Sequence, residues 1–182
     1  MSDNPTERQK AETSKNDLQK ANLMGKHLEG ADLSGGDLSG ANLRKSKLAD
    51  ANLKGAKLHK TPLSTADLSG ADLSDADLSG AECIATNFTG AQLTGTTFDR
   101  ASVSKAVMTD ANLKGADMSN VINLTCQQLQ SAYIDATTRL PDYIKIKWRT
   151  DTEYDCGDRV QRIGEGLFVS RFRGTKRCSK KF

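Results

Sequence analysis

An apolar residue returns every five positions over more than half of this chain, and that period constrains the fold more than any other feature. The series begins at Leu18, ends at Met118 and comprises 21 consecutive units. The residue two positions before each apolar centre is Ala in 14 units, and the residue two positions after it is Gly in ten. The whole five-residue unit therefore repeats, and not a single position alone.

A period of five fits neither a continuous helix nor a continuous strand. On an α-helix, five residues advance the chain by about 500°, so the centres would spread around the whole circumference. On a strand, successive centres would alternate between opposite faces, because five is odd. The pattern works only if the chain turns a corner once per unit, with the small residue and the centre both pointing inward. Gly and Asn suit the backbone of such corners. The sequence therefore predicts an all-β coil.

These units resemble the pentapeptide repeat family. The runs ADLSG-GDLSG-ANLRK and ADLSG-ADLSD-ADLSG follow its A-(D/N)-L-x-x pattern. The resemblance covers residues 16–120 and implies a right-handed quadrilateral β-helix with four units per coil and about five coils, an all-β solenoid. Arranged by fours, one face stacks leucines that we expect to form a core ladder: Leu33, Leu53, Leu73, Leu93 and Leu113.

The segments outside the repeat are expected to be a tail, a cap and an extension. Residues 1–15 are polar and predicted to be disordered, with a short helix over the first coil as the alternative, so a homodimer could form through an uncovered first coil. Residues 121–142 are predicted to be a capping helix. Residues 143–182 form a basic extension, predicted to hold a strand and a hairpin around 164–166. The helix prediction rests on a capping box and an apolar stripe: Thr125 with Gln128, then Leu129, Ala132, Tyr133 and Ala136, ending at Pro141.

The charge is nearly balanced in the repeat and basic in the extension. Lys+Arg 26 against Asp+Glu 23 give a net charge of +3. Residues 16–120 carry 13 acids and 11 bases, which argues against a basic nucleic-acid binder and falls short of a DNA-like field. Residues 121–182 carry 7 acids and 12 bases. Within this part, Trp148, Arg171 and Arg173 are candidate contacts to nucleic acid or an anionic membrane surface.

The four cysteines leave two interpretations open. None forms a CxxC pair, so neither a zinc ribbon nor a thioredoxin-type site is supported. The cysteines are either reduced thiols of a cytosolic protein, or Cys156 and Cys178 form a bridge that requires an oxidising compartment. Cys83 occupies a centre position and is expected to be a core thiol. No apolar run approaches the roughly 18 residues of a spanning helix, and the first residues show no secretory signal, so a cytoplasmic location is expected.

No group of residues in the sequence indicates catalysis, a cofactor or a metal site. The aspartates that precede the centres face water, and the glycine- and aspartate-rich calcium pattern is absent. His27 and His59 fall on different faces of the predicted coil. Residues 83–98 contain no charge at all, and Ile84 points outward among them, which makes Ile84 a candidate anchor for a partner.

Three functions are open at this stage. The first is a non-catalytic rigid scaffold that mediates protein–protein interaction. The second follows from the resemblance alone, since some members of the family bind DNA gyrase or topoisomerase IV by mimicking duplex DNA. Here one face carries a partly acidic column, interrupted by Lys57: Asp17, Asp37, Asp77 and Asp117. The third is contact of the basic tail with nucleic acid or an anionic membrane.

Overall fold

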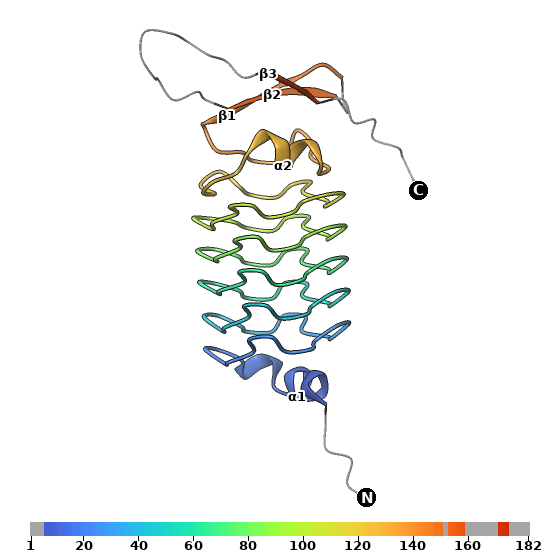
Figure 1. Cartoon of the computed structure of the whole chain (residues 1–182), viewed down its shortest axis with the longest axis vertical. Helices are drawn as coiled ribbons and strands as arrows, with labels where there is room; N and C mark the ends of the chain where they lie inside the picture. Colours follow the sequence, from blue (N-terminus) through green and yellow to red (C-terminus); the bar gives the residue numbers. More distant parts are fainter. Residues whose placement is uncertain (1–5, 151–152, 159–170, 175–182) are drawn as a thin grey trace, which may run out of the picture.

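Parallel β-bridges join residues twenty positions apart, so four five-residue units make one coil. The computed structural model describes residues 6–150, 153–158 and 171–174, and for Asp158 and residues 171–174 it describes the backbone alone. The twenty-residue spacing holds from the Asn22–Asn42 bridge to the Ser102–Ile122 bridge. Figure 1 shows the coils stacked into a rod, with one helix below the first coil and a helix and a small sheet beyond the last.

One hydrogen-bond pattern repeats in every coil and explains the five-residue unit. The amide of the centre Leu53 donates forward to Asp72 O at 2.7 Å, and the amide of Asn52 donates backward to Ala31 O at 2.8 Å. At the corner, Ala56 N donates to Leu53 O at 3.0 Å. From Leu18 to Leu113, the residue two after each centre adopts a left-handed backbone, with φ near +60°, as at Gly70. Glycine adopts this conformation without strain, which accounts for its frequency there.

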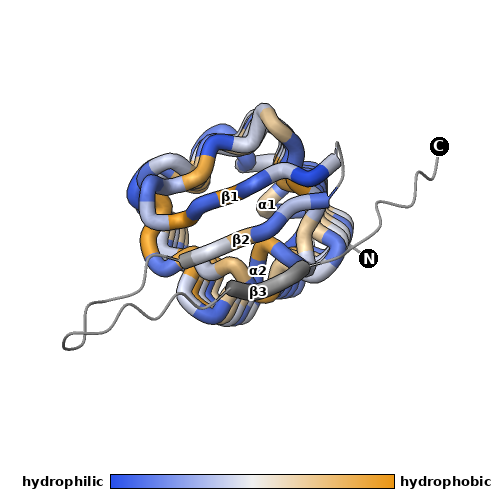
Figure 2. The backbone as a smooth tube through the Cα atoms, turned by 90° about the horizontal axis from the view of Figure 1, so that it is seen from above, coloured by the Kyte–Doolittle hydropathy of each residue, from blue (hydrophilic) through white to orange (hydrophobic). Residues whose placement is uncertain are grey.

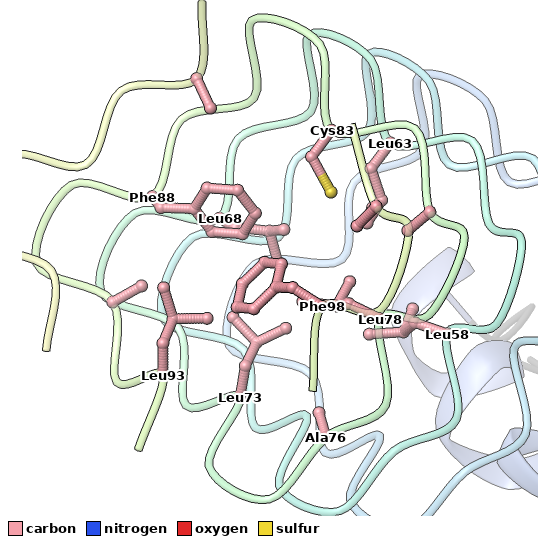
Figure 3. Packing of buried hydrophobic residues seen from close by; sticks show 14 of the residues in the cluster. Leu58, Leu63, Leu68, Leu73, Ala76, Leu78, Cys83, Phe88, Leu93 and Phe98 are labelled. Carbon is pink, nitrogen blue, oxygen red and sulfur yellow. The ribbon is translucent and has the colours of Figure 1, made fainter. Parts of the chain in front are cut away.

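The centres fill the rod with a continuous apolar core. Leu33, Leu53, Leu73, Leu93 and Leu113 are all fully buried. Figure 3 shows Phe88 and Phe98 pointing into the interior above Leu73 and beside Cys83. The two rings meet edge to face with centroids 6.5 Å apart, an arrangement that adds to the free energy gained from burial. Because each coil contacts only its neighbours, this core is a stack of similar layers.

Three buried threonines stand where most units have Ala. Thr61, Thr86 and Thr96 are fully buried. Their hydroxyls donate to centre carbonyls of the preceding coil: Leu38 O at 2.9 Å, Leu63 O at 2.8 Å and Leu73 O at 2.8 Å. Each hydroxyl is therefore satisfied, which is the condition for tolerating a polar group inside the rod.

The first coil is covered by a helix, so the predicted disorder is wrong for residues 6–15. Helix α1 spans Glu7–Thr13, is capped by a box between Thr6 and Gln9, and buries Ala11 against the coil. A short 3₁₀ helix, η1, follows over Lys15–Asp17. The Thr6-x-x-Gln9 capping box is the signal in the sequence for the start of this helix.

This N-terminal segment supplies the acceptors that a preceding coil would have provided. Glu7 Oε2 accepts from His27 N at 3.2 Å, and Glu12 Oε1 accepts from Asp32 N at 2.9 Å. Lys15 O accepts from Asp37 N at 2.9 Å. Three of the four faces of the first coil are therefore closed, which removes the reason for expecting a homodimer there.

We expect this cover to loosen at low pH. A hydrogen bond from Lys26 holds the pKa of Glu7 below its ordinary value, and one from Arg8 does the same for Glu12. Because the folded pKa values are lowered, the stabilisation is present above about pH 4.5 and is lost as the pH falls through them. Hydrogen-exchange protection of the His27 and Asp32 amides should fall several-fold between pH 6 and pH 3. The double variant Glu7→Gln, Glu12→Gln should show low protection at both pH values; equal protection in both proteins would contradict the prediction.

The coil continues past the capping helix, which is shorter than the sequence predicted. Helix α2 spans Cys126–Gln130, and its capping box between Thr125 and Gln128 is present. The predicted helical stripe beyond Gln130 is wrong. Tyr133 N donates to Ala111 O at 2.8 Å and Arg139 N donates to Ala116 O at 2.9 Å, so both positions pair with the last repeat coil. The helix therefore replaces one face of a further coil, because the free edge of the stack offers more hydrogen bonds than an isolated helix end.

A three-stranded antiparallel sheet lies across the end of the rod (Figure 2). Strand β1 spans Ile144–Trp148, β2 spans Tyr154–Asp158 and β3 spans Arg171–Gly174, in the order β1-β2-β3. The predicted strand over 144–148 is confirmed. Most of the predicted hairpin, residues 159–170, lies outside the described residues, and β2, which the sequence analysis did not predict, pairs with β1 and β3.

Candidate functional site

A disulfide that the sequence did not predict fixes the C-terminal end. Cys126 of α2 is bonded to Cys156 of β2, with a Cα–Cα distance of 5.7 Å, and both residues are buried. The predicted Cys156–Cys178 pair is therefore wrong, because β2 lies over α2 and turns Cys156 toward it; Cys178 itself lies outside the described residues. The expectation that all thiols are reduced is also wrong for this pair. Disulfides are typical of oxidising compartments, so the bridge does not fit the cytoplasmic expectation.

Two tyrosines attach the sheet to the last coil. Tyr143 Oη accepts from Leu124 N at 3.0 Å and donates to Val121 O at 3.1 Å. Tyr154 Oη donates to Leu129 O at 2.8 Å, and burial raises the pKa of Tyr154 to about 12. Trp148, a predicted interaction residue, packs edge to face on Tyr154 at 5.3 Å and is half-buried. The structure thus places Trp148 in a packing contact within the chain.

The sheet combines an apolar inner side with exposed lysines. Ile144 is buried, whereas Lys145 and Lys147 are exposed. The register aligns Lys145 with Gly157 and Arg171, and Lys147 with Asp155 and Arg173. Only the backbone of Arg171 and Arg173 is described, so the structure shows their place in the sheet and not their contacts.

A groove opens where α2 interrupts the coil. It has a volume of about 1030 Å³, and Ser104, Lys105, Ile122 and Tyr143 are among the residues that line it. The chain leaves the five-residue register here: the left-handed residue after Ile122 is Asn123, with φ 63°, two positions earlier than the period predicts. No signal recognised in the sequence pointed to this groove, because it arises from the loss of register and not from a motif.

Gln128 closes part of the edge that the missing strand leaves open. Its side-chain Nε2 donates to Val103 O at 2.8 Å and to Ala106 O at 2.9 Å. In the preceding coil the equivalent of Ala106 O, which is Thr86 O, accepts from the backbone amide of Val107. A side-chain amide thus replaces a backbone amide at this point of the ladder.

Along the rod, charge is arranged in bands that compensate one another. A basic coil with Lys47 and Lys57 lies directly on an acidic coil, because Lys47 bridges to Asp67 and Lys57 bridges to Asp77. Arg44 and Glu82 also form an ion pair at 2.6 Å. The next turn, residues 83–98, has no charged residue, and Ile84 is 41% exposed in it. This turn therefore presents a surface that has no charge to desolvate.

The partly acidic column is also broken by bases. Its bridges run through Asp37, Lys57, Asp77, Thr97 and Asp117, and the last of these continues to Arg139, which also forms an ion pair with Asp117 at 3.2 Å. Duplex DNA presents unbroken negative charge. The column therefore gives little support to DNA mimicry.

Over residues 6–150, 153–158 and 171–174, no group of three or more His, Cys, Asp or Glu side chains is placed to hold a metal ion. None of the helices in the described part of the chain has the length and apolar character needed to cross a bilayer.

The chain belongs to the pentapeptide repeat family. The model of pentapeptide repeats matches eight copies over residues 17–48, 46–82 and 86–122, more than half of the sequence. Proteins of this family form right-handed quadrilateral β-helices, and the twenty-residue bridges fit that architecture. A search of curated proteins found no match.

Several solved structures are similar to this chain. A pentapeptide repeat protein of the Arabidopsis thaliana thylakoid lumen has 31% identity and a TM-score of 0.53, covering 61% of this chain and 73% of that one. Rfr23 of the cyanobacterium Cyanothece has 27% identity and a TM-score of 0.48, with 54% and 66% covered. QnrB1, a plasmid-mediated fluoroquinolone resistance protein, has 19% identity and a TM-score of 0.32, with 60% and 61% covered.

Proposed function

We propose that the protein is a non-catalytic scaffold: a stiff rod that binds a protein partner through its side. The observation that carries this proposal is the uncharged turn over residues 83–98, on which Ile84 is exposed between charged coils. A rod with a continuous core and covered ends holds such a surface rigidly, so little conformational entropy is lost on binding. Pentapeptide repeat proteins are, in general, structural or interaction proteins.

The test is affinity capture from a lysate of the source organism with the full-length protein as bait. Ile84→Asp should reduce capture of the partner at least tenfold, because a carboxylate would be desolvated in the contact. Met24→Asp is the matched control, since Met24 occupies the same position of the same face, three coils away, and is 47% exposed. Equal capture by the wild type and the Ile84 variant would refute the proposed contact.

The same experiment separates the two alternatives. If the captured partner is DNA gyrase or topoisomerase IV and Asp37→Asn with Asp77→Asn abolishes capture, the acidic column is the binding surface. If capture disappears between low and moderate salt and with Lys145→Glu, Lys147→Glu, the basic extension makes the contact, since such binding depends on released counterions. Salt-insensitive capture that depends on Ile84 supports the scaffold.

A further inference from the structure

We propose that the groove at the end of the repeat binds an extended peptide segment of a partner protein, in which an acidic residue lies next to a large apolar one. This inference rests on the proposed scaffold function and assigns a second, more specific contact to it. The groove lies between Ser104 and Lys105 of the last full repeat coil and the Ile122–Thr125 segment that leads into α2.

Backbone amides at this edge have lost the partners that equivalent amides have elsewhere. On the same face, Lys45, Thr65 and Ala85 donate from their amides to Ser64 O, Ile84 O and Ser104 O of the next coil. Within the described part of the chain, nothing accepts from Lys105 N, because the chain leaves the register at Asn123. The amide of Met108, one corner further, is also without an acceptor there, whereas the equivalent Phe88 N donates to Val107 O at 2.8 Å.

An unpaired donor at the edge of a β-ladder is suited to a carbonyl or carboxylate of an added extended segment. One coil earlier, the equivalent amides of Ala85 and Phe88 donate to Ser104 O and Val107 O, two acceptors that lie three residues apart in the sequence. A peptide that follows the same path would extend the ladder where α2 interrupts it. Gln128 already donates to Ala106 O. The groups left to pair at this corner are therefore amide donors, which a peptide would have to match with carbonyl or carboxylate acceptors.

The charge and the apolar surface of the groove define the peptide further. Lys105 is exposed and, within the described part of the chain, is the only charged residue that lines the groove. Ile122 is 47% exposed in the groove, and Val107, next to the lining residue Ala106, is 45% exposed. One lysine is too little for a phosphate backbone, which requires several neutralising bases. A carboxylate at Lys105 with an apolar side chain on Ile122 satisfies both features.

The charge of the groove disfavours the C-terminal residues 175–182 of this chain as its occupant. Residues 175–182 carry four bases and no acid. Their charge therefore has the same sign as that of Lys105, which repels them. The nearest carboxylate in the sequence is Asp110, which follows the lining residue Thr109 and does not itself line the groove. The acidic position of the peptide therefore belongs at the Lys105 end and not near Asp110.

The experiment is selection of a phage-displayed library of random decapeptides on the full-length, oxidised protein. Enriched peptides should carry Asp or Glu within two positions of Leu, Ile, Val or Phe. Their affinity should fall about tenfold or more for Lys105→Glu and for Ile122→Asp, and less than about twofold for Lys114→Glu, an exposed lysine of the same coil on another face. In amide NMR spectra, the Lys105 resonance should shift on binding, as expected for a new hydrogen bond.

Peptides without an acidic preference, peptides that bind Lys105→Glu as well as the wild type, or no enrichment at all would overturn the proposal. Self-association through this corner, seen as a mass change that Lys105→Glu abolishes, would overturn it as well, because the occupant would then be a second copy. Peptide selection and lysate capture are separate readouts, and Met24→Asp, which lies four coils from Ser104 on the same face, should leave peptide binding unchanged. Failure of the groove is therefore distinguishable from failure of the scaffold proposal, which is read from capture through Ile84.

Discussion

Leu73→Asp should abolish the cooperative unfolding of the rod. Leu73 is fully buried in the middle of the leucine ladder, and Figure 3 shows it between Leu93 and Phe98, which offer no hydrogen-bond donor. Removing the leucine side chain alone typically costs about 2–5 kcal/mol. A carboxylate at the site adds the cost of burying a polar or charged group without a partner, which brings the total to about 5 kcal/mol or more. Thermal unfolding followed by circular dichroism measures the effect.

The matched control for that variant is Gln92→Asp. Gln92 is exposed, and Leu73 N donates to its backbone carbonyl at 2.8 Å, so the two positions are direct neighbours in the same ladder. The control adds the same charge on the water side and should change the free energy of unfolding by less than about 1 kcal/mol. A melting curve of Leu73→Asp that coincides with that of the wild type would refute the buried ladder as the source of stability.

The repeat was predictable from the sequence because the residues of each five-residue unit determine the backbone geometry of that unit. An inward centre, a small inward residue and a left-handed corner recur at fixed distances, and a parallel coil at twenty-residue spacing satisfies all of them together. A threonine in place of the small inward residue also fits this geometry: the hydroxyl of Thr96 donates to the Leu73 carbonyl, which accepts from Ala76 N as well. The position of Ile84 on the surface follows from the same rule.

The ends were less predictable, because their conformation depends on the coil that they cover. Residues 6–17 form helices whose carboxylates accept from His27 and Asp32, and the polar composition that suggested disorder is what this contact requires. Beyond Gln130 the sequence has the apolar stripe of a helix. The backbone amides of Tyr133 and Arg139 nevertheless donate to the open edge of the last coil, so the chain continues the coil there. The pairing of Cys156 depends on how β2 crosses α2, which no spacing along the chain specifies.

Reduction of the Cys126–Cys156 bridge should loosen the C-terminal cap while leaving the repeat folded. The bridge closes a loop with a sequence separation of 30, for which the chain-entropy model gives about 3–4 kcal/mol. Stability in a solenoid is shared mainly between neighbouring layers, so the loss should be confined to α2, β1, β2 and the adjoining coil. Hydrogen exchange of these segments should accelerate at least tenfold in dithiothreitol, whereas the amides of Leu53 and Leu73 should keep their protection.

The double variant Cys126→Ala, Cys156→Ala is the control that assigns this effect to the bridge. It should exchange as fast as the reduced wild type and should not respond to dithiothreitol. Cys83 does not confound the comparison, because complete burial raises the pKa of its thiol to about 12 and keeps it unreactive. The hydrogen bonds of Tyr143 and Tyr154 to Val121, Leu124 and Leu129 do not involve the disulfide. If these contacts alone held the cap, the reduced wild type would retain full protection, and the stabilising role of the disulfide would be disproved. If the cap opens, the groove beside α2 opens with it, and peptide binding at Lys105 becomes dependent on the oxidised state of the protein.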